Sequence, residues 1–103
     1  MPNFTIEQLQ HDHLCDAWPL VRMSGLEASV DWWVHDATEL IHHGGGVLVA
    51  RAPDGSIHGV ATYEVLGEPP LAKVVPGKIL VTFELNGNAP VKRTLCKTLE
   101  QMQ

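Results

Sequence analysis

The C-terminal quarter of this 103-residue chain changes its hydrophobic period from that of a strand, two residues, to that of a helix, 3.6 residues. Residues 79–85 (ILVTFEL) are rich in β-branched and aromatic side chains and lie between Pro76-Gly77 and Asn86-Gly87, which is typical of a buried strand with turns at both ends. Beyond residue 90, apolar side chains recur at helical spacing, at Val91, Leu95, Leu99 and Met102. The chain must therefore build a sheet whose last strand leads directly into an amphipathic helix.

The turn between this strand and this helix suits an anion. Asn88 is a favourable N-cap residue, and Pro90 fits the first helical turn, where a backbone N–H is not needed. The free N–H groups of that turn, with Lys92 and Arg93 close behind, would form a site for a phosphate or carboxylate. The alternative is an ordinary helix terminus that binds only water.

The first half of the chain predicts one strand and two helices. Residues 4–9 alternate apolar and polar side chains, as in an edge strand with one solvent-exposed face. Residues 11–24 predict a helix whose cap is either Asp12 or Asp16, and Pro19 is harmless only with the second cap. Ser29 is the expected N-cap of the second helix, which three consecutive glycines end.

Residues 47–52 and 57–65 predict a β-hairpin around a Pro-Asp-Gly turn. The continuous apolar run of the first arm indicates burial on both faces, and Gly59 in the second arm marks a bulge or a close backbone approach. Residues 66–75 predict a loop before the last strand. The order is therefore β-α-α-β-β-β-α, an α+β fold with a mostly antiparallel sheet in a single domain, residues 1–103.

Composition excludes several classes of function. Seven Lys and Arg against twelve Asp and Glu give a net charge of −5, which argues against a nucleic-acid or anionic-membrane surface. No apolar run approaches the roughly 20 residues of a membrane span. Cys15 and Cys96 do not form a ligand pair and no signal peptide precedes Asn3, so we expect free thiols in a cytoplasmic setting. The histidine pairs at 11 and 13 and at 42 and 43 lack partner ligands, so no metal centre is expected.

This order of elements resembles the first half of the GNAT acetyltransferase fold. The resemblance implies a three-layer arrangement in which residues 79–85 are the fourth strand and the last helix is the pyrophosphate-binding third helix. It also implies acetyl-CoA as coenzyme and a small-molecule or protein amine as acceptor. The C-terminal strands of the family are missing from this chain.

The loop before the last helix departs from the family pattern. In the family, an Arg or Gln precedes Gly-x-Gly or Gly-x-Ala, whose backbone amides hold the coenzyme pyrophosphate. Here Gly87 takes the position of the Arg or Gln, and Asn88, Pro90 and Lys92 fall where the glycines would be. Proline has no N–H to donate, and larger side chains crowd a backbone approach. The residues expected at the coenzyme are Leu85, Asn88, Ala89, Val91, Lys92 and Arg93.

Acetyl transfer needs a base for the amine proton and a donor for the departing thiolate. By position, Glu84 on the last strand is the candidate base and Tyr63 the candidate acid, with Glu64 or His58 as alternatives. Tyr63 matches no position of the family, whose usual acid tyrosine lies in the missing part. The alternative for Glu84 is a solvent-facing residue of a half-exposed strand.

In the family, the loop between the first two helices borders the acceptor site, so Met23 and Trp32 would line a substrate pocket or a partner surface. The alternative for Trp32 is packing at the rim of the core. Without a fifth strand, residues 79–85 would leave an unpaired apolar edge, so we expect a homodimer that pairs or covers it.

Two functions follow from these observations. The first is a GNAT-like domain that transfers an acetyl group from acetyl-CoA to an amine. The second is a non-catalytic GNAT-like homodimeric module that binds a ligand or a partner.

Overall fold

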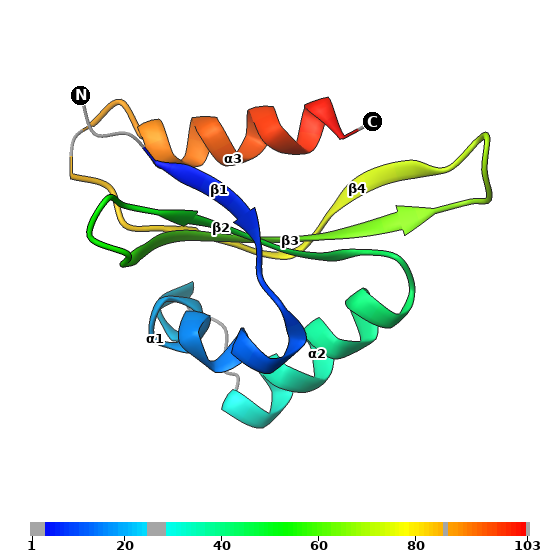
Figure 1. Cartoon of the computed structure of the whole chain (residues 1–103), viewed down its shortest axis with the longest axis horizontal. Helices are drawn as coiled ribbons and strands as arrows, with labels where there is room; N and C mark the ends of the chain where they lie inside the picture. Colours follow the sequence, from blue (N-terminus) through cyan, green and yellow to red (C-terminus); the bar gives the residue numbers. More distant parts are fainter. Residues whose placement is uncertain (1–3, 25–28, 86, 103) are drawn as a thin grey trace.

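The computed structural model describes residues 4–24, 29–85 and 87–102. In these residues four strands form one antiparallel sheet in the order β1-β2-β3-β4. The predicted α+β class and element order are confirmed (Figure 1). The elements are β1 (Thr5–Gln8), the 3-10 segment η1 (His11–Ala17), α1 (Trp18–Val21), the 3-10 segment η2 (Arg22–Ser24), α2 (Val30–His42), β2 (Gly46–Arg51), β3 (Ile57–Leu66), β4 (Lys73–Thr82) and α3 (Pro90–Gln101).

Helices cover both faces of the sheet, with α3 on one face and α1 and α2 on the other (Figure 1). The central strand β2 requires this arrangement, because residues 47–50 are all buried and successive strand residues point to opposite faces. Val47 and Val49 join the core beneath α1 and α2. Leu48 and Ala50 join the core beneath α3. The predicted burial of this strand on both faces is confirmed.

The helix α2 begins as predicted, with Ser29 as its N-cap. The Ser29 Oγ accepts a hydrogen bond of 3.1 Å from the backbone N–H of Trp32. In the next position, Trp33 is fully buried and donates from its indole Nε1 to the Leu14 carbonyl at 2.8 Å. This bond ties α2 to η1 and holds the helical layer together.

The segment predicted as one helix over residues 11–24 is a short α-helix between two 3-10 segments. Pro19 lies in the first turn of α1, and the N-cap is Ala17 instead of Asp12 or Asp16. Proline removes one backbone donor and blocks continuation of a regular helix from the preceding turn. This explains why the segment is broken into pieces.

The last strand begins and ends earlier than predicted. β4 spans Lys73–Thr82, so it includes part of the predicted loop at 66–75 and stops before Phe83. Val74 and Val75 extend the strand because they pair with Val65 and Glu64 of β3. The proline and glycine at 76 and 77 do not end it, since both residue types are tolerated at an edge or a bulge. Asn86, predicted as part of the bounding turn, lies outside the described residues.

A bulge interrupts β4 halfway. The pairs Ala61–Leu80 and Tyr63–Pro76 are two residues apart along β3 but four residues apart along β4, so β4 carries extra residues between them. The Thr62 Oγ1 fills the gap, accepting from the backbone N–H of Ile79 at 3.1 Å. A Cβ on Gly77 would lie 2.4 Å from this oxygen, so only glycine fits there. Bulges turn backbone groups away from the ladder and are frequent beside active sites.

Gly59 lies where side chains of α3 pack closely against the sheet. A Cβ at this position would lie 2.7 Å from both Leu95 Cδ1 and Val91 Cγ1 of α3. The register also shifts beside it, between Ala50 and Arg51 of β2. Both parts of the prediction for Gly59 are therefore confirmed, and the glycine determines how deeply α3 sits on the sheet.

Within the residues described, no helix has both the length and the apolar character needed to cross a membrane.

Gly59→Ala should destabilise the protein, because the new methyl group must push α3 away from β3. We expect the free energy of unfolding to fall by about 1–3 kcal/mol in urea denaturation. The control is Gly87→Ala, at an exposed position where an added Cβ meets no atom within 4 Å, and it should stay within about 0.5 kcal/mol of wild type. Equal stability of the two variants would contradict this account of α3 packing.

Candidate functional site

The chain between β4 and α3 is anchored at Phe83. Its backbone N–H donates to the His58 carbonyl at 2.7 Å, continuing the ladder beyond β4. Its ring also meets the His58 imidazole edge-on, with the ring centroids 5.7 Å apart. The sheet therefore determines the direction in which the following residue, Glu84, leaves the strand.

The helix α3 begins with an unusual cap. Pro90 lies in its first turn as predicted, but the N-cap is Ala89 and not Asn88. Ala89 adopts a left-handed conformation, with φ 48° and ψ 55°, and makes no side-chain cap hydrogen bond. An alanine methyl cannot accept a hydrogen bond, so the N–H groups of the first turn need another acceptor.

Glu84 supplies that acceptor from outside the helix. Its Oε1 accepts from the backbone N–H of Val91 at 3.2 Å, and its Oε2 accepts from that of Lys92 at 3.0 Å. The next amide, of Arg93, already bonds to the Ala89 carbonyl at 3.1 Å. The N-terminus of α3 thus holds a carboxylate in two adjacent hydrogen bonds, the arrangement expected of an anion site at a helix terminus.

The predicted coenzyme residues gather at this terminus. Val91 is buried, while Lys92 and Arg93 are exposed, and neither cation takes part in an ion pair within the described ranges. Leu85 is 74% exposed, and Asn88 is also exposed. The expected anion-binding geometry is present, although Glu84, predicted as a base, occupies its two amides. The roles of all these residues stay predictions.

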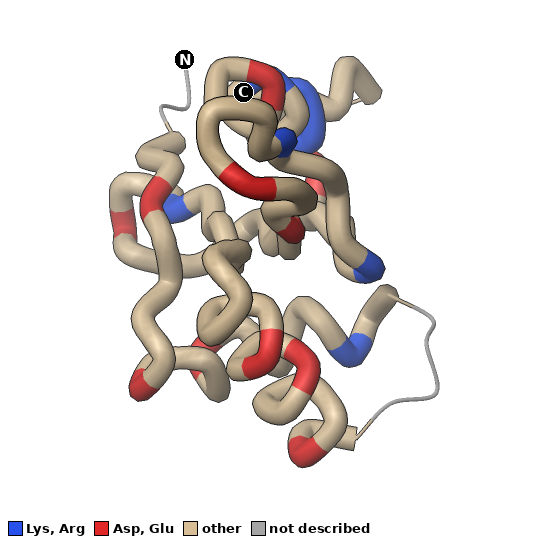
Figure 2. The backbone as a smooth tube through the Cα atoms, turned by 90° about the vertical axis from the view of Figure 1, so that its right-hand side faces the viewer, with Lys and Arg blue, Asp and Glu red and all other residues tan. Residues whose placement is uncertain are grey.

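The charges of the molecule are unevenly distributed. Of the seven Lys and Arg, five lie on β4 and α3, while α2 carries three acidic residues and no Lys or Arg. In Figure 2 the blue segments concentrate in the upper part of the view with α3, and red segments dominate the lower helical layer. The helix that carries the candidate site is therefore richer in cations than α2 and favours anions more.

Tyr63 is buried on the α3 side of the sheet, away from Glu84. Gln8 donates from its Nε2 to the Tyr63 hydroxyl. Burial raises the pKa of Tyr63 above its ordinary value of 10.0, and the Gln8 hydrogen bond opposes this effect. Along β3, Tyr63 lies four residues beyond Gly59, which pairs with the end of β4. Four residues of a strand span about 13 Å, and Glu84 follows the end of β4 that pairs with Gly59. The structure therefore does not bring the two predicted catalytic residues together.

Met23 and Trp32 lie on the opposite side of the sheet from α3. Met23 is 64% exposed on η2, which contacts β4. Trp32 is half-buried and packs against the core beneath α1 and α2, in agreement with the rim packing considered as its alternative. A substrate role for either residue stays a prediction.

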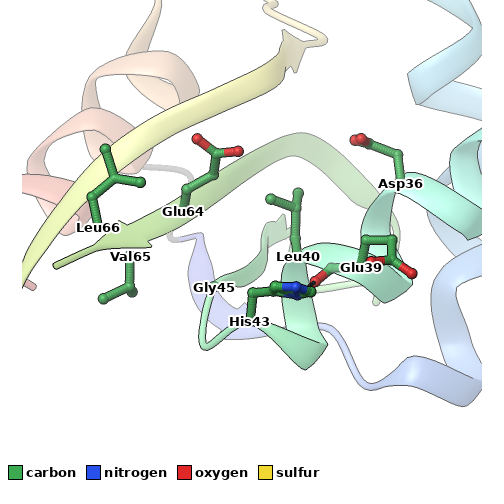
Figure 3. A pocket seen from close by; sticks show the side chains of 8 residues that line it. All are labelled: Asp36, Glu39, Leu40, His43, Gly45, Glu64, Val65 and Leu66. Atoms are coloured by element: carbon green, nitrogen blue, oxygen red, sulfur yellow. Dashed lines mark hydrogen bonds between the residues drawn. The ribbon is translucent and has the colours of Figure 1, made fainter. Parts of the chain in front are cut away.

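An acidic pocket of about 360 Å³ lies between the C-terminal half of α2 and the end of β3 (Figure 3). The sequence patterns did not predict it, because its members are distant in sequence. The Asp36 Oδ2 is buried without a hydrogen-bond partner. The pocket favours cations and lies away from the N-terminus of α3. Its lining residues are Asp36, Glu39, Leu40, His43, Gly45, Glu64, Val65 and Leu66.

The described part of the chain contains no group of three or more His, Cys, Asp or Glu residues placed to hold a metal ion.

No protein-family model and no curated protein sequence matches this chain. The solved structures that share its fold include the following three. An aminoglycoside N-acetyltransferase, AAC(6')-Iy, in complex with CoA has a TM-score of 0.74 and 15% identity, over 99% of this chain and 70% of that one. An acetyltransferase of Trypanosoma brucei has a TM-score of 0.69 and 16% identity, over 97% and 74% of the two chains. Glucosamine-6-phosphate N-acetyltransferase from Arabidopsis thaliana has a TM-score of 0.68 and 12% identity, over 96% and 73%.

The chain therefore has the GNAT acetyltransferase fold, and the resemblance drawn from the order of its elements is confirmed. Its four-stranded sheet corresponds to part of that fold, since this chain spans 70–74% of each of the three structures.

Tyr63 is the only tyrosine in the chain, so its titration is directly visible in the ultraviolet absorbance of the phenolate. We expect a midpoint above 10.0 in the folded protein and near that value in denaturant. The folded state then retains the proton longer than the unfolded state, so this contribution to stability is complete below pH 10.0 and is lost as the pH rises through the folded pKa. A folded midpoint at or below the denatured one would contradict the burial of this hydroxyl.

Proposed function

We propose that this protein is a GNAT-type N-acetyltransferase that binds acetyl-CoA with the N-terminus of α3 and acetylates an amine. The observation that carries the proposal is the pair of amides at Val91 and Lys92, which already holds a carboxylate in the part of the fold expected to bind pyrophosphate. The acetyltransferase fold and the CoA present in one structural neighbour support the same assignment.

The residues around these amides fit a diphosphate in charge and exposure. Lys92 and Arg93 are exposed on the first turn of α3, so both side chains are free to reach phosphate oxygens. The helix dipole adds a partial positive charge at the same place. Pro90 offers no amide, so binding depends on Val91, Lys92 and the two cationic side chains.

The edge of β4 provides a path from α3 toward the bulge at residues 77–79. When bound, acetyl-CoA supplies a thioester whose carbonyl carbon an amine attacks, which breaks the carbon–sulfur bond and releases a thiolate. The backbone of Tyr63 pairs with Pro76 beside the bulge, whereas its buried hydroxyl accepts from Gln8 on the β1 side of the sheet, so its role as the acid stays a prediction. Met23 lies on η2, which contacts β4, and we propose it as a residue that meets the acceptor. Glu84 is not assigned as the base in this proposal, because its carboxylate holds the α3 amides away from Tyr63, and the amine proton passes to water.

A second function, a homodimeric binding module, is favoured by the exposed edge of β4. This strand ends the sheet of the described residues, and the exposed fractions of Leu80 and Phe83 next to this edge are 43% and 46%. An apolar edge of this kind favours pairing with another strand. We propose a second copy of the chain as the partner, an arrangement compatible with either function.

Isothermal titration calorimetry with acetyl-CoA tests the coenzyme site. The variant Lys92→Ala/Arg93→Ala should bind roughly thirtyfold more weakly than wild type, if two phosphate contacts of about 1 kcal/mol each are lost. Lys97→Ala, which removes an exposed charge further along α3, is the control and should bind like wild type. No binding by wild type at millimolar acetyl-CoA would exclude the proposed enzyme.

Light scattering at micromolar concentration tests the dimer. Wild type should have twice the monomer mass, and Leu80→Lys should be monomeric because a charge blocks the edge. Leu71→Lys, at a position that is 80% exposed between β3 and β4, is the control and should remain dimeric. A monomeric wild-type protein would contradict the homodimer.

A further inference from the structure

The contact between Glu84 and α3 involves the same two amides that the proposed coenzyme site needs. Every amide of the first turn is accounted for, since Pro90 has none, Val91 and Lys92 donate to Glu84, and Arg93 donates to Ala89. A phosphate oxygen can therefore bind these N–H groups only after the carboxylate has left. An added anion would also be repelled by the charge of Glu84 at this short range.

We propose that Glu84 is an internal competitor that closes the coenzyme site until acetyl-CoA displaces its carboxylate. This inference rests on the function proposed above and adds regulation of the same site. Glu84 mimics a phosphate because its two oxygens engage two adjacent amides at 3.2 and 3.0 Å. The closed form is therefore the stable state of the free protein.

The contact is built so that it can open. Glu84 is only half-buried, and the backbone before it is held by the hydrogen bond and the ring contact between Phe83 and His58. Rotation of the Glu84 side chain alone is therefore sufficient to release the two amides. In the described residues no side chain forms an ion pair with Glu84, and the only hydrogen bonds found for its carboxylate are those to the two amides. Lys92 and Arg93 therefore stay available to an incoming diphosphate, which carries more charge than one carboxylate.

The cost of displacement lowers the apparent affinity for the coenzyme. The affinity of a site is reduced by the fraction of molecules in the competent state, here the open state. A neutral glutamine of nearly the same size holds the two amides less strongly than a carboxylate, because hydrogen bonds to charged groups are stronger. Glu84→Gln should therefore bind acetyl-CoA about tenfold more tightly than wild type.

The test measures acetyl-CoA affinity by calorimetry and thermal stability without ligand. We expect Glu84→Gln to bind more tightly and to unfold at a lower temperature, since it loses a charged helix cap. The control Glu100→Gln removes the same charge from an exposed position at the far end of α3 and should change neither quantity. If Glu84 were only a structural cap, Glu84→Gln would lower the unfolding temperature without increasing the affinity for acetyl-CoA. An increase in affinity together with a loss of stability therefore indicates competition.

Unchanged or weaker binding by Glu84→Gln, with wild type binding normally, would overturn the competitor role and leave the proposed enzyme intact. Failure of both proteins to bind at millimolar acetyl-CoA would overturn both. If Glu84→Gln does not fold, wild-type amide NMR decides. The Val91 and Lys92 resonances should shift on saturation with acetyl-CoA, and their constancy would overturn the inference.

Discussion

The structure depends on a sheet whose central strands are apolar on both faces. The buried residues 47–50 of β2 cannot face water, so helices must cover the sheet from both sides. The chain meets this need with α1 and α2 on one face and α3 on the other. Gly59 then determines how closely α3 lies, and with it the position of the candidate anion site.

The N-terminus of α3 follows from local chemistry. Helix amides that point away from the helix need an acceptor, and the side chain of Ala89 offers none. Ala89 is left-handed, and the carboxylate of Glu84, two residues beyond the end of β4, meets these amides instead. The acetyltransferase fold of this chain thus comes with an anion-binding helix terminus that its own carboxylate fills.

The helices on the two faces of the sheet differ in charge, since α3 carries three Lys and Arg and α2 carries none. Five of the seven cationic side chains lie on β4 and α3, whereas the pocket beside α2 contains Asp36, Glu39 and Glu64. A diphosphate is favoured at the first of these regions and a cation at the second. This division agrees with a function in which an anionic coenzyme approaches from the α3 side.

Sequence patterns alone determined the order of elements, the burial of β2, the Ser29 cap and the close approach at Gly59. These features depend on neighbouring residues, through strand alternation, helix capping and the small size of glycine. Tertiary structure decided the bulge in β4, the acidic pocket and the environment of Tyr63, because each needs residues that only strand register brings together. It also decided the partner of the α3 amides. The local rule favoured Asn88, and the path of the chain after Phe83 brought Glu84 there, since capping selects whichever acceptor the fold places within reach.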